Sequence, residues 1–303
     1  WTAALWHLRG APGKAATEQL VIDGRKSTIP TANFLDARDG ILAADMASNG
    51  GANQCLIWRV FAGREMGVNA STTADQDVVT PSLDVPAGCL PTANAGGPYT
   101  TPEGTDVVLS GAGSSAGSDA SAGAITAYEW DFDNDGQYDD GAGSAPTFMN
   151  VGQDGTFTVS LRVTNSAGVE DTSSTTVTVT NVSPAVNLDP IAATVEGGAV
   201  TLSGAGIDSG WLDTLAATVD WDDGNGLQPL TGITENTRSD ATLAFSTAHV
   251  YGDNGAFVIS VCVSDDDTTT CSTVTAAVSN VNPTAVIAPA GHTTYDGTSA
   301  DVA

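Results

Sequence analysis

The sequence has little positive charge. Its 303 residues contain nine Lys and Arg against 36 Asp and Glu, which gives a formal net charge of −27 at pH 7. Only Arg162 and Arg238 are basic after residue 90, so nearly all of the excess negative charge lies there. Such a surface repels nucleic acid and anionic lipid. It suits a protein kept soluble in salty or calcium-containing surroundings, and a solvated acidic surface without any ligand is an equally good interpretation.

Long apolar runs are also missing. No run is long enough to span a bilayer, so we expect no membrane insertion. An initiator Met and a signal peptide are absent as well, which indicates a processed or excerpted piece of a longer protein.

Histidine is scarce, and the zinc motif HExxH is absent. The three histidines are His7, His249 and His292; none is followed by Glu and no two lie at a ligand spacing. Zinc peptidases of the HExxH type need two such histidines. The chain therefore lacks the histidine pair of that type of zinc site.

The four cysteines are most simply two disulfides, which points to an oxidising, extracellular compartment. If Ile259 pairs with Val274 in a hairpin, Cys262 falls opposite Cys271 and both point outward. The alternative is two separate thiols on the sheet surface. The remaining cysteines are Cys55 and Cys89, whose pairing sequence spacing alone does not establish.

An internal repeat organises the chain after residue 90. PTANAGGPYTTPEGTDVVLSGAG from Pro91 corresponds to PAVNLDPIAATVEGGAVTLSGAG from Pro184, and PTAVIAPAG from Pro283 opens a third copy. Short alternating strands separated by Gly, Asn and Asp predict tandem antiparallel β-sandwiches. The residues expected to face the two cores are Phe157, Val159, Leu161 and Val163 in the first copy and Phe257, Ile259, Val261 and Val263 in the second.

Residues 1–90 differ from the repeats and predict three helices. Residues 1–9 are rich in Ala and Leu and stop at Gly10. A second helix begins at Phe34 and is ended by Asn49 and the following glycines, and a third carries Leu56, Ile57, Val60 and Phe61 and stops at Gly67. Because this segment has few large apolar residues, we expect it to depend on a missing partner for stability.

The amino-acid sequence of this segment resembles that of a known family. NFLDARDGILAADMASNGGANQCLIWRVFAGREMGVNAS at 33–71 and VPAGC at 85–89 are similar to the closing segment of fungalysin-type secreted zinc metalloproteases. In that family the helix with the last catalytic histidine reads roughly EVHxxGxxW, and Trp1 stands at its tryptophan. The resemblance implies that the active site and its zinc lie upstream of this chain. It also implies a disulfide between Cys55 and Cys89.

The repeats resemble a second family. YEWDFDNDG at 128–136 and GTFTVSLRVTNSAG at 155–168 are similar to the polycystic-kidney-disease (PKD) type of immunoglobulin-like domain, while the second copy lacks the Phe after Trp221 and Asp222. In bacterial secreted enzymes such domains commonly follow the catalytic domain. The resemblance implies spacers or modules that bind a substrate or surface.

One loop of the first repeat could bind Ca²⁺. Carboxylates at alternate positions, a Gly turn and a backbone carbonyl are what a hard cation needs, and the candidate ligands are Asp131, Asp133, Asp135, Gln137 and Asp139. The Glu that would complete an EF-hand is absent, because Ala142 occupies the twelfth position. In the alternative, Asp131 and Asp133 only cap backbone amides of an acidic turn. In the second repeat we expect Asp222, Asp223 and 265–267 to be turn residues.

The sequence thus predicts a multidomain α plus all-β fold. A helical peptidase-domain tail at 1–90 precedes PKD-like immunoglobulin-like sandwiches at 91–182 and 183–281 and the start of a third repeat at 282–303. The parent would be a secreted zinc metalloendopeptidase that acts on protein substrates, with the repeats as spacers or units that bind a substrate or an extracellular or cell-surface polymer. The alternative is a non-catalytic structural or adhesive β-repeat protein, stabilised by calcium. An HExxH upstream would favour the first interpretation.

Overall fold

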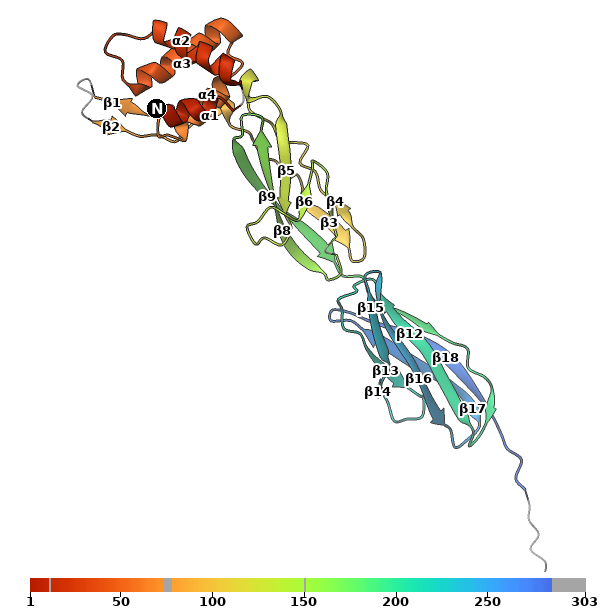
Figure 1. Ribbon diagram of the computed structural model, residues 1–303. Coiled ribbons are helices and arrows are strands. Elements are labelled where there is room, and N and C mark those ends of the chain that lie inside the picture. The colour runs from red at the N-terminus through yellow and green to blue at the C-terminus, as the bar shows by residue number, and fades with distance from the viewer. Residues whose placement is uncertain (11, 74–77, 150, 285–303) are drawn as a thin grey trace, which may run out of the picture. The chain divides into compact units, whose positions relative to one another are not determined.

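A computed structural model describes residues 1–10, 12–73, 78–149 and 151–284 (Figure 1). The chain forms two compact units. The first comprises residues 1–182 with two later segments, 208–213 and 236–241, and the second comprises 183–207, 214–235 and the residues from 242 on. Most of the expected third repeat lies outside the described residues, which end at 284.

In the described residues, the first unit begins with four helices, where the sequence predicted three. They are α1 (Thr2–Leu8), α2 (Lys14–Lys26), α3 (Phe34–Asn49) and α4 (Gln54–Ala62). The missed helix is α2, which buries only Thr17, Leu20 and Gly24 and so has no clear apolar stripe. The predicted end of the last helix at Gly67 was also wrong. The helix ends at Ala62 because Glu65 takes a left-handed conformation, with φ 64°, that stops helical continuation.

Helix α3 begins where the sequence predicted, because Asn33 caps it. The Asn33 side chain accepts hydrogen bonds from the N–H groups of Leu35 and Asp36, and the Asp36 carboxylate accepts the N–H of Asn33 in return. This reciprocal arrangement satisfies amides that a helix start otherwise leaves without partners. At the other end, Gly50 closes the helix in the left-handed conformation.

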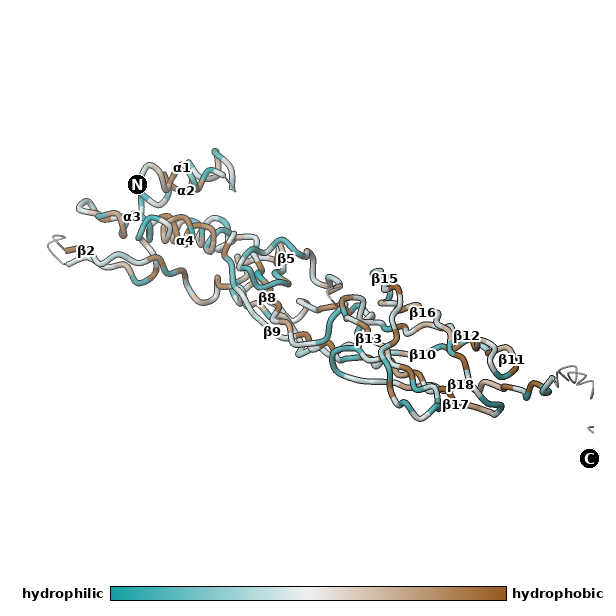
Figure 2. Tube along the Cα trace, turned by 90° about the horizontal axis from the view of Figure 1, so that it is seen from below, coloured by the Kyte–Doolittle hydropathy of each residue, from teal (hydrophilic) through white to brown (hydrophobic). Residues whose placement is uncertain are grey.

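The helices enclose a small core. Its largest fully buried side chains are Leu8, Ile41, Ile57 and Phe61, and the Trp1 ring packs against Phe61 with 5.5 Å between centroids. Figure 2 shows α4 as a largely hydrophobic helix. Several large apolar side chains remain outside this core: Trp6, Ile22, Ile29 and Phe34 are 53–68% exposed.

The rest of the first unit is mainly an antiparallel sandwich. A five-stranded sheet has the order β3-β9-β8-β5-β6, and β4 pairs with β7 in a separate two-stranded sheet. The strands of these two sheets are β3 (Tyr99–Pro102), β4 (Val107–Val108), β5 (Ile125–Asp131), β6 (Gly141–Ala142), β7 (Thr147–Phe148), β8 (Gly155–Asn165) and β9 (Glu170–Thr180). Strands β3 and β9 pair in parallel. A short pair, β1 (Ser71–Thr72) and β2 (Val79–Thr80), lies between the helices and the sandwich in sequence.

The alternation in β8 sets the core of this sandwich. Val159, Leu161 and Val163 are fully buried with Trp130 and Phe148, as the sequence predicted. Phe157 is partly buried and packs against the same core.

The described residues of the second unit form two sheets. A four-stranded sheet has the order β10-β12-β16-β15, and a five-stranded sheet has the order β11-β18-β17-β13-β14. The strands are β10 (Ala185–Leu188), β11 (Thr194–Val195), β12 (Ala199–Asp208), β13 (Ala216–Asp220), β14 (Gln228–Leu230), β15 (Ile233–Thr237), β16 (Asp240–Val250), β17 (Gly255–Ser264) and β18 (Thr269–Ser279). The core residues of β17 follow the predicted alternation, with Ile259, Val261 and Val263 fully buried.

Two disulfides are present, Cys55–Cys89 and Cys262–Cys271. In the hairpin of β17 and β18, Ile259 pairs with Val274 and Cys262 with Cys271. Cys55 and Cys89 are buried between α4 and the sandwich, against Ala122 and Ala167. Within the described residues, no helix combines the length and the apolar character that crossing a membrane requires.

Candidate functional site

The candidate calcium loop connects β5 to β6. Asp131 ends β5 and is 2% exposed, and its two carboxylate oxygens accept the N–H groups of Asn134 at 2.6 Å and Gly136 at 2.9 Å. Asn134 and Gly136 have φ 60° and 88°, so the loop turns through left-handed positions that Asn and Gly tolerate best. The local sequence therefore folds the loop back around Asp131.

Three of the five predicted ligands come together. Asp131, Asp133 and Asp135 each have a carboxylate oxygen within 4.8 Å of the others. Gln137 is next to them, because its backbone N–H and its side-chain amide both donate to Asp135, at 2.7 and 2.8 Å. Asp139 is exposed and does not belong to the group of three.

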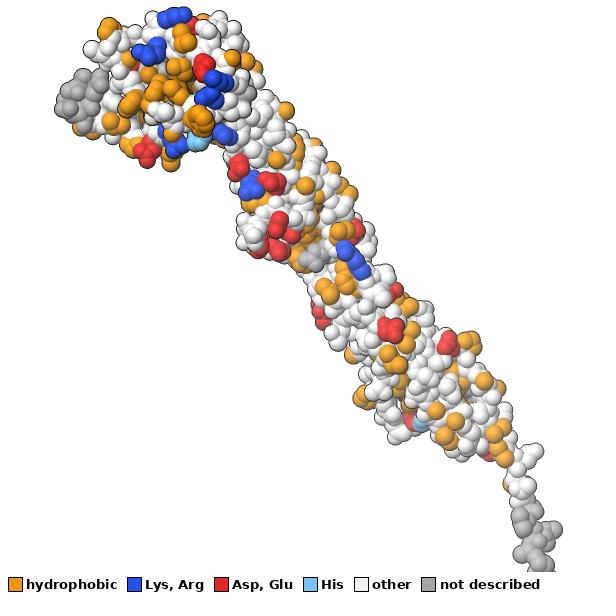
Figure 3. All heavy atoms as spheres, in the orientation of Figure 1, with side chains coloured by type: hydrophobic (Ala, Val, Ile, Leu, Met, Phe, Trp, Pro, Cys, Tyr) orange, Lys and Arg blue, Asp and Glu red, His pale blue; other side chains and the backbone are white. Residues whose placement is uncertain are grey.

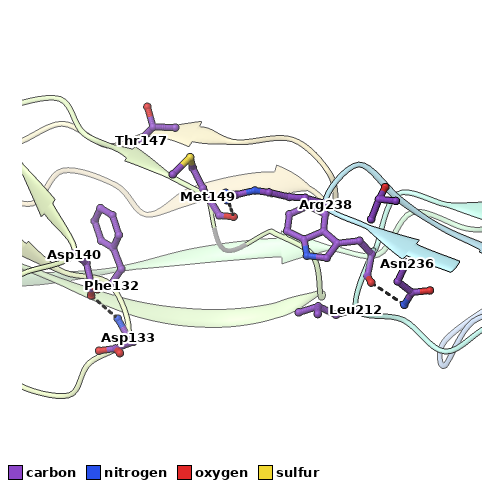
Figure 4. A pocket seen from close by; sticks show the side chains of 10 residues that line it. Phe132, Asp133, Asp140, Thr147, Met149, Leu212, Asn236 and Arg238 are labelled. Carbon is purple, nitrogen blue, oxygen red and sulfur yellow. Dashed lines mark hydrogen bonds between the residues drawn. The ribbon is translucent and has the colours of Figure 1, made fainter.

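Asp140 has a role in the loop that the sequence did not reveal. Its Oδ2 accepts the backbone N–H groups of Phe132 at 2.6 Å and Asp133 at 3.3 Å, and Figure 4 shows these residues beside one another. Asp140 thus holds the start of the loop. A run of adjacent acids in the sequence does not tell which member binds backbone.

Neighbouring carboxylates change the pKa of Asp133 in this loop. The hydrogen bond from the Asp135 N–H lowers the pKa of Asp133, but desolvation and the carboxylates of Asp135, Asp140 and Asp131 outweigh it, so the pKa is raised above its ordinary value. Crowded oxygens of this kind are typical of calcium loops. The same carboxylates also cap backbone amides, as an acidic turn without metal would do.

The corresponding loop of the second repeat is built differently. Asp223 Oδ2 lies 3.3 Å from His249 Nε2, and the His249 ring stacks on Trp221 at 4.7 Å. Asp223 also accepts the backbone N–H and the side-chain amide of Asn225, which with the His249 charge hold its pKa below the ordinary range. Asp222 accepts the N–H of Val258. These acids are engaged in turn and strand contacts.

Tyr251 completes that cluster. Its hydroxyl donates to the Trp221 carbonyl at 2.6 Å, and burial, together with the neighbouring aspartates, raises its pKa to about 12. No sequence pattern indicated the contact of His249 with Asp223, since His249 lies on β16 of the four-stranded sheet and Asp223 follows β13 of the five-stranded sheet.

Among the described residues, none of the groups of three or more close metal ligands contains a histidine. His7 Nδ1 lies 3.2 Å from Arg64 Nη2 on the surface. Sequence reasoning also missed one buried group of acids, Glu103, Asp208 and Asp213, whose members are far apart along the chain.

Comparison with known proteins agrees with both resemblances. Residues 3–70 match the fungalysin metallopeptidase (M36) family, and residues 89–180 match the PKD domain. Extracellular metalloproteinase 9 of Coccidioides posadasii is 48% identical over 77 residues, which cover 25% of this chain and 12% of that protein. Extracellular metalloproteinase 1 of Phaeosphaeria nodorum is 48% identical over 84 residues, 26% of this chain and 12% of that protein. The chain thus matches only about an eighth of the length of these curated relatives.

Solved structures give weaker likenesses. The fibronectin(III)-like modules of Clostridium thermocellum CbhA share 17% identity and a TM-score of 0.24 over 63% of this chain and 95% of theirs. The Rst D1-D2 structure shares 10% identity and a TM-score of 0.33 over 63% of this chain and all of that one. Both TM-scores are below 0.5, and the fold is given by the observed sheets and the PKD match. The chain contains a fungalysin-type segment at residues 3–70, followed by a PKD domain at residues 89–180.

Proposed function

We propose that this chain is part of a secreted zinc metalloendopeptidase whose catalytic motif lies upstream, and that the β-sandwiches serve it as spacers or as units that bind substrate or a surface. The observation that carries the proposal is the fungalysin match of residues 3–70, with relatives named extracellular metalloproteinases at 48% identity. The parent's zinc would activate a water for attack on a peptide bond. This chain alone would have no proteolytic activity.

The surface of the helical segment supports the same proposal. Trp6, Phe34 and Ile29 are exposed by 60–68%, on a segment that has only a small core. Figure 3 shows hydrophobic side chains exposed among the Lys and Arg side chains of this segment. A large exposed apolar surface marks an interaction site, and the remainder of a peptidase domain would cover it. Two disulfides fit secretion into an oxidising compartment.

The first test is the coding region upstream of Trp1. An HExxH with a downstream Glu and a His shortly before Trp1 would support the peptidase. Recombinant protein extended to include that region should then hydrolyse casein, lose activity in 1,10-phenanthroline and recover it with Zn²⁺. An upstream region without a zinc motif, joined to further β repeats, would overturn the proposal.

The second candidate is a non-catalytic structural or adhesive protein. It is favoured by the acidic β repeats that make up most of the chain, at a net charge of −27. Sedimentation of the whole chain with insoluble collagen, elastin, cellulose and chitin separates the roles of the repeats. Saturable retention on one matrix would make them binding modules. Absence of retention on all of them would favour a spacer.

A further inference from the structure

A second group of carboxylates lies apart from the calcium loop and is buried. One oxygen each from Glu103, Asp208 and Asp213 lies within 4.8 Å of the others. Each of the three residues is only 2% exposed. Glu103 follows β3, Asp208 ends β12, and residues 208–213 belong to the first compact unit with Glu103.

The backbone around these acids is firmly held. The Glu103 N–H donates to the Thr180 carbonyl at 3.1 Å, and the Leu212 N–H donates to the Gly152 carbonyl at 2.9 Å. Trp211 packs against the core of the first sandwich. The carboxylates are therefore placed by sheet and core contacts and are not left on an exposed turn.

Two glycines make the close approach possible. A Cβ on Gly210 would lie 2.3 Å from the Asp213 carboxylate, and a Cβ on Gly104 would lie 3.0 Å from the side chain of Ser209. Gly210 also donates its N–H to Asp208 at 2.8 Å. The segment 208–213 thus wraps its acids tightly toward Glu103.

Glu103 lacks a partner for one of its oxygens. Oε2 accepts the Val182 N–H at 3.0 Å, whereas the buried Oε1 has no hydrogen-bond partner. Burial raises the pKa of Glu103; the N–H groups of Val182 and Asp154 oppose this shift, and the charges of Asp208 and Asp154 add to it. A buried carboxylate without full compensation is costly, so it requires either a proton or a cation.

Basic side chains do not supply Glu103 with that cation. After residue 90 the sequence has no Lys and only two Arg. Arg162 pairs with Glu129 at 2.9 Å, and Arg238 donates to the Met149 carbonyl while lying over Trp211. Glu103 is in none of the ion pairs found among the described residues.

We propose that Glu103, Asp208 and Asp213 bind one Ca²⁺. Calcium takes oxygen ligands at about 2.3–2.6 Å, so oxygens on opposite sides of the ion stand about 5 Å apart. The three carboxylate oxygens lie within 4.8 Å of one another, close enough to bind the same ion. Zn²⁺ prefers N and S ligands, and Mg²⁺ demands a smaller octahedron with retained waters, so an all-carboxylate group of this size selects Ca²⁺. Water and peptide oxygens complete the six to eight ligands. Binding holds residues 208–213 against Glu103.

The test uses the whole chain with Asp133→Asn and Asp135→Asn, which removes two predicted ligands of the β5–β6 loop. After treatment with a chelator, calcium is titrated at pH 7 by calorimetry, and the thermal midpoint is measured with and without 10 mM Ca²⁺. We expect one equivalent of Ca²⁺ and a rise in the midpoint. Adding Glu103→Gln should weaken binding at least tenfold, and Asp213→Asn should do the same. Glu170→Gln, at an exposed position of the same unit, is the matched control and should leave binding unchanged.

A structural role for Glu103 would give a different pattern. If Glu103→Gln only damaged the fold, the thermal midpoint would fall equally with and without calcium. The proposal predicts instead that the calcium-free variant is at least as stable as its calcium-free parent, because a buried charge has been removed. The proposal would be overturned if calcium gave neither a heat of binding nor a shift in thermal midpoint in the chain with Asp133→Asn and Asp135→Asn. It would also be overturned if calcium binding were unchanged by Glu103→Gln and Asp213→Asn.

Discussion

At the residue scale, Asp45 shows how a buried charge is made stable. It is fully buried near the end of α3 and accepts hydrogen bonds from Asn49, from Gln54 and from both the backbone and the side chain of Asn53. Burial by itself would raise its pKa, but the donors outweigh burial and hold the pKa below its ordinary value. Asp45→Asn should therefore lower the free energy of unfolding of the helical segment by about 2–3 kcal/mol. Far-UV circular dichroism at 222 nm during urea unfolding reports on the helices, and an unchanged midpoint would contradict the prediction.

The pH dependence follows from the same depressed pKa. A carboxyl whose pKa is lower in the folded state than in the unfolded state stabilises the fold. This contribution is fully present above the pKa of the unfolded state, which is about 3.9 for Asp. That contribution is lost as the pH falls through the lower folded value. Between pH 6 and pH 2 the wild type should therefore lose more helical stability than Asp45→Asn, and parallel curves would exclude the assignment.

The β5–β6 loop carries its own residue-scale prediction. If Asp131, Asp133 and Asp135 bind calcium, Asp133→Ala in the otherwise native chain should remove one equivalent of Ca²⁺ from a calorimetric titration. Asp139→Ala should have little effect, because Asp139 is outside the group of three. Equal stoichiometry in the wild type and Asp133→Ala would mean that the loop is only an acidic turn.

At the element scale, the contact of α2 with α3 depends on two glycines. A Cβ on Gly40 would lie 2.7 Å from the Gly24 carbonyl oxygen, so the helix backbones meet without side chains between them. Gly40→Ala should destabilise the helical segment by about 1–3 kcal/mol through overpacking. Gly63→Ala is the control, since its Cβ would have only an ordinary contact at 3.5 Å and its φ is −62°. Equal thermal midpoints for the two variants would refute the close-packing argument.

The β17–β18 hairpin gives a second prediction at this scale. Cys262→Ser with Cys271→Ser should lower the stability of the second unit by about 2–3 kcal/mol, because the disulfide limits the unfolded chain. The first sandwich pairs Arg162 with Thr172 at the equivalent place and needs no bridge. Proteolysis followed by mass spectrometry should show faster cleavage in the second unit and unchanged cleavage in the first. Equal sensitivity of both units would contradict it.

At the whole-molecule scale, the chain combines a fungalysin-type segment with β repeats of strongly acidic composition. Its expected inertness is itself testable. The purified chain should not cleave casein with or without added Zn²⁺, because it lacks HExxH. Zinc-dependent cleavage that copurifies with the chain would contradict this prediction, because residues of this chain would then have to bind the zinc without an HExxH motif.

Sequence alone determined the features that depend on short-range patterns. Alternation predicted the inward faces of β8 and β17, apolar spacing from Phe34 predicted the start of α3, and hairpin register put Cys262 opposite Cys271. Each depends on neighbours within one strand, helix or hairpin, where residue period and turn chemistry suffice. The two family resemblances likewise depended on stretches of residues that are contiguous in the sequence.

Tertiary structure decided what distant segments make together. Helix α2 has no clear apolar stripe, and its close approach to α3 depends on the Gly24–Gly40 contact, which a one-dimensional pattern does not contain. The contact of His249 with Asp223 and the approach of Glu103 to Asp208 and Asp213 join residues that only sheet pairing and core packing bring near. The physical reason is that the stability of a buried charge depends on the groups that surround it in space. For these residues, those groups come from distant parts of the chain.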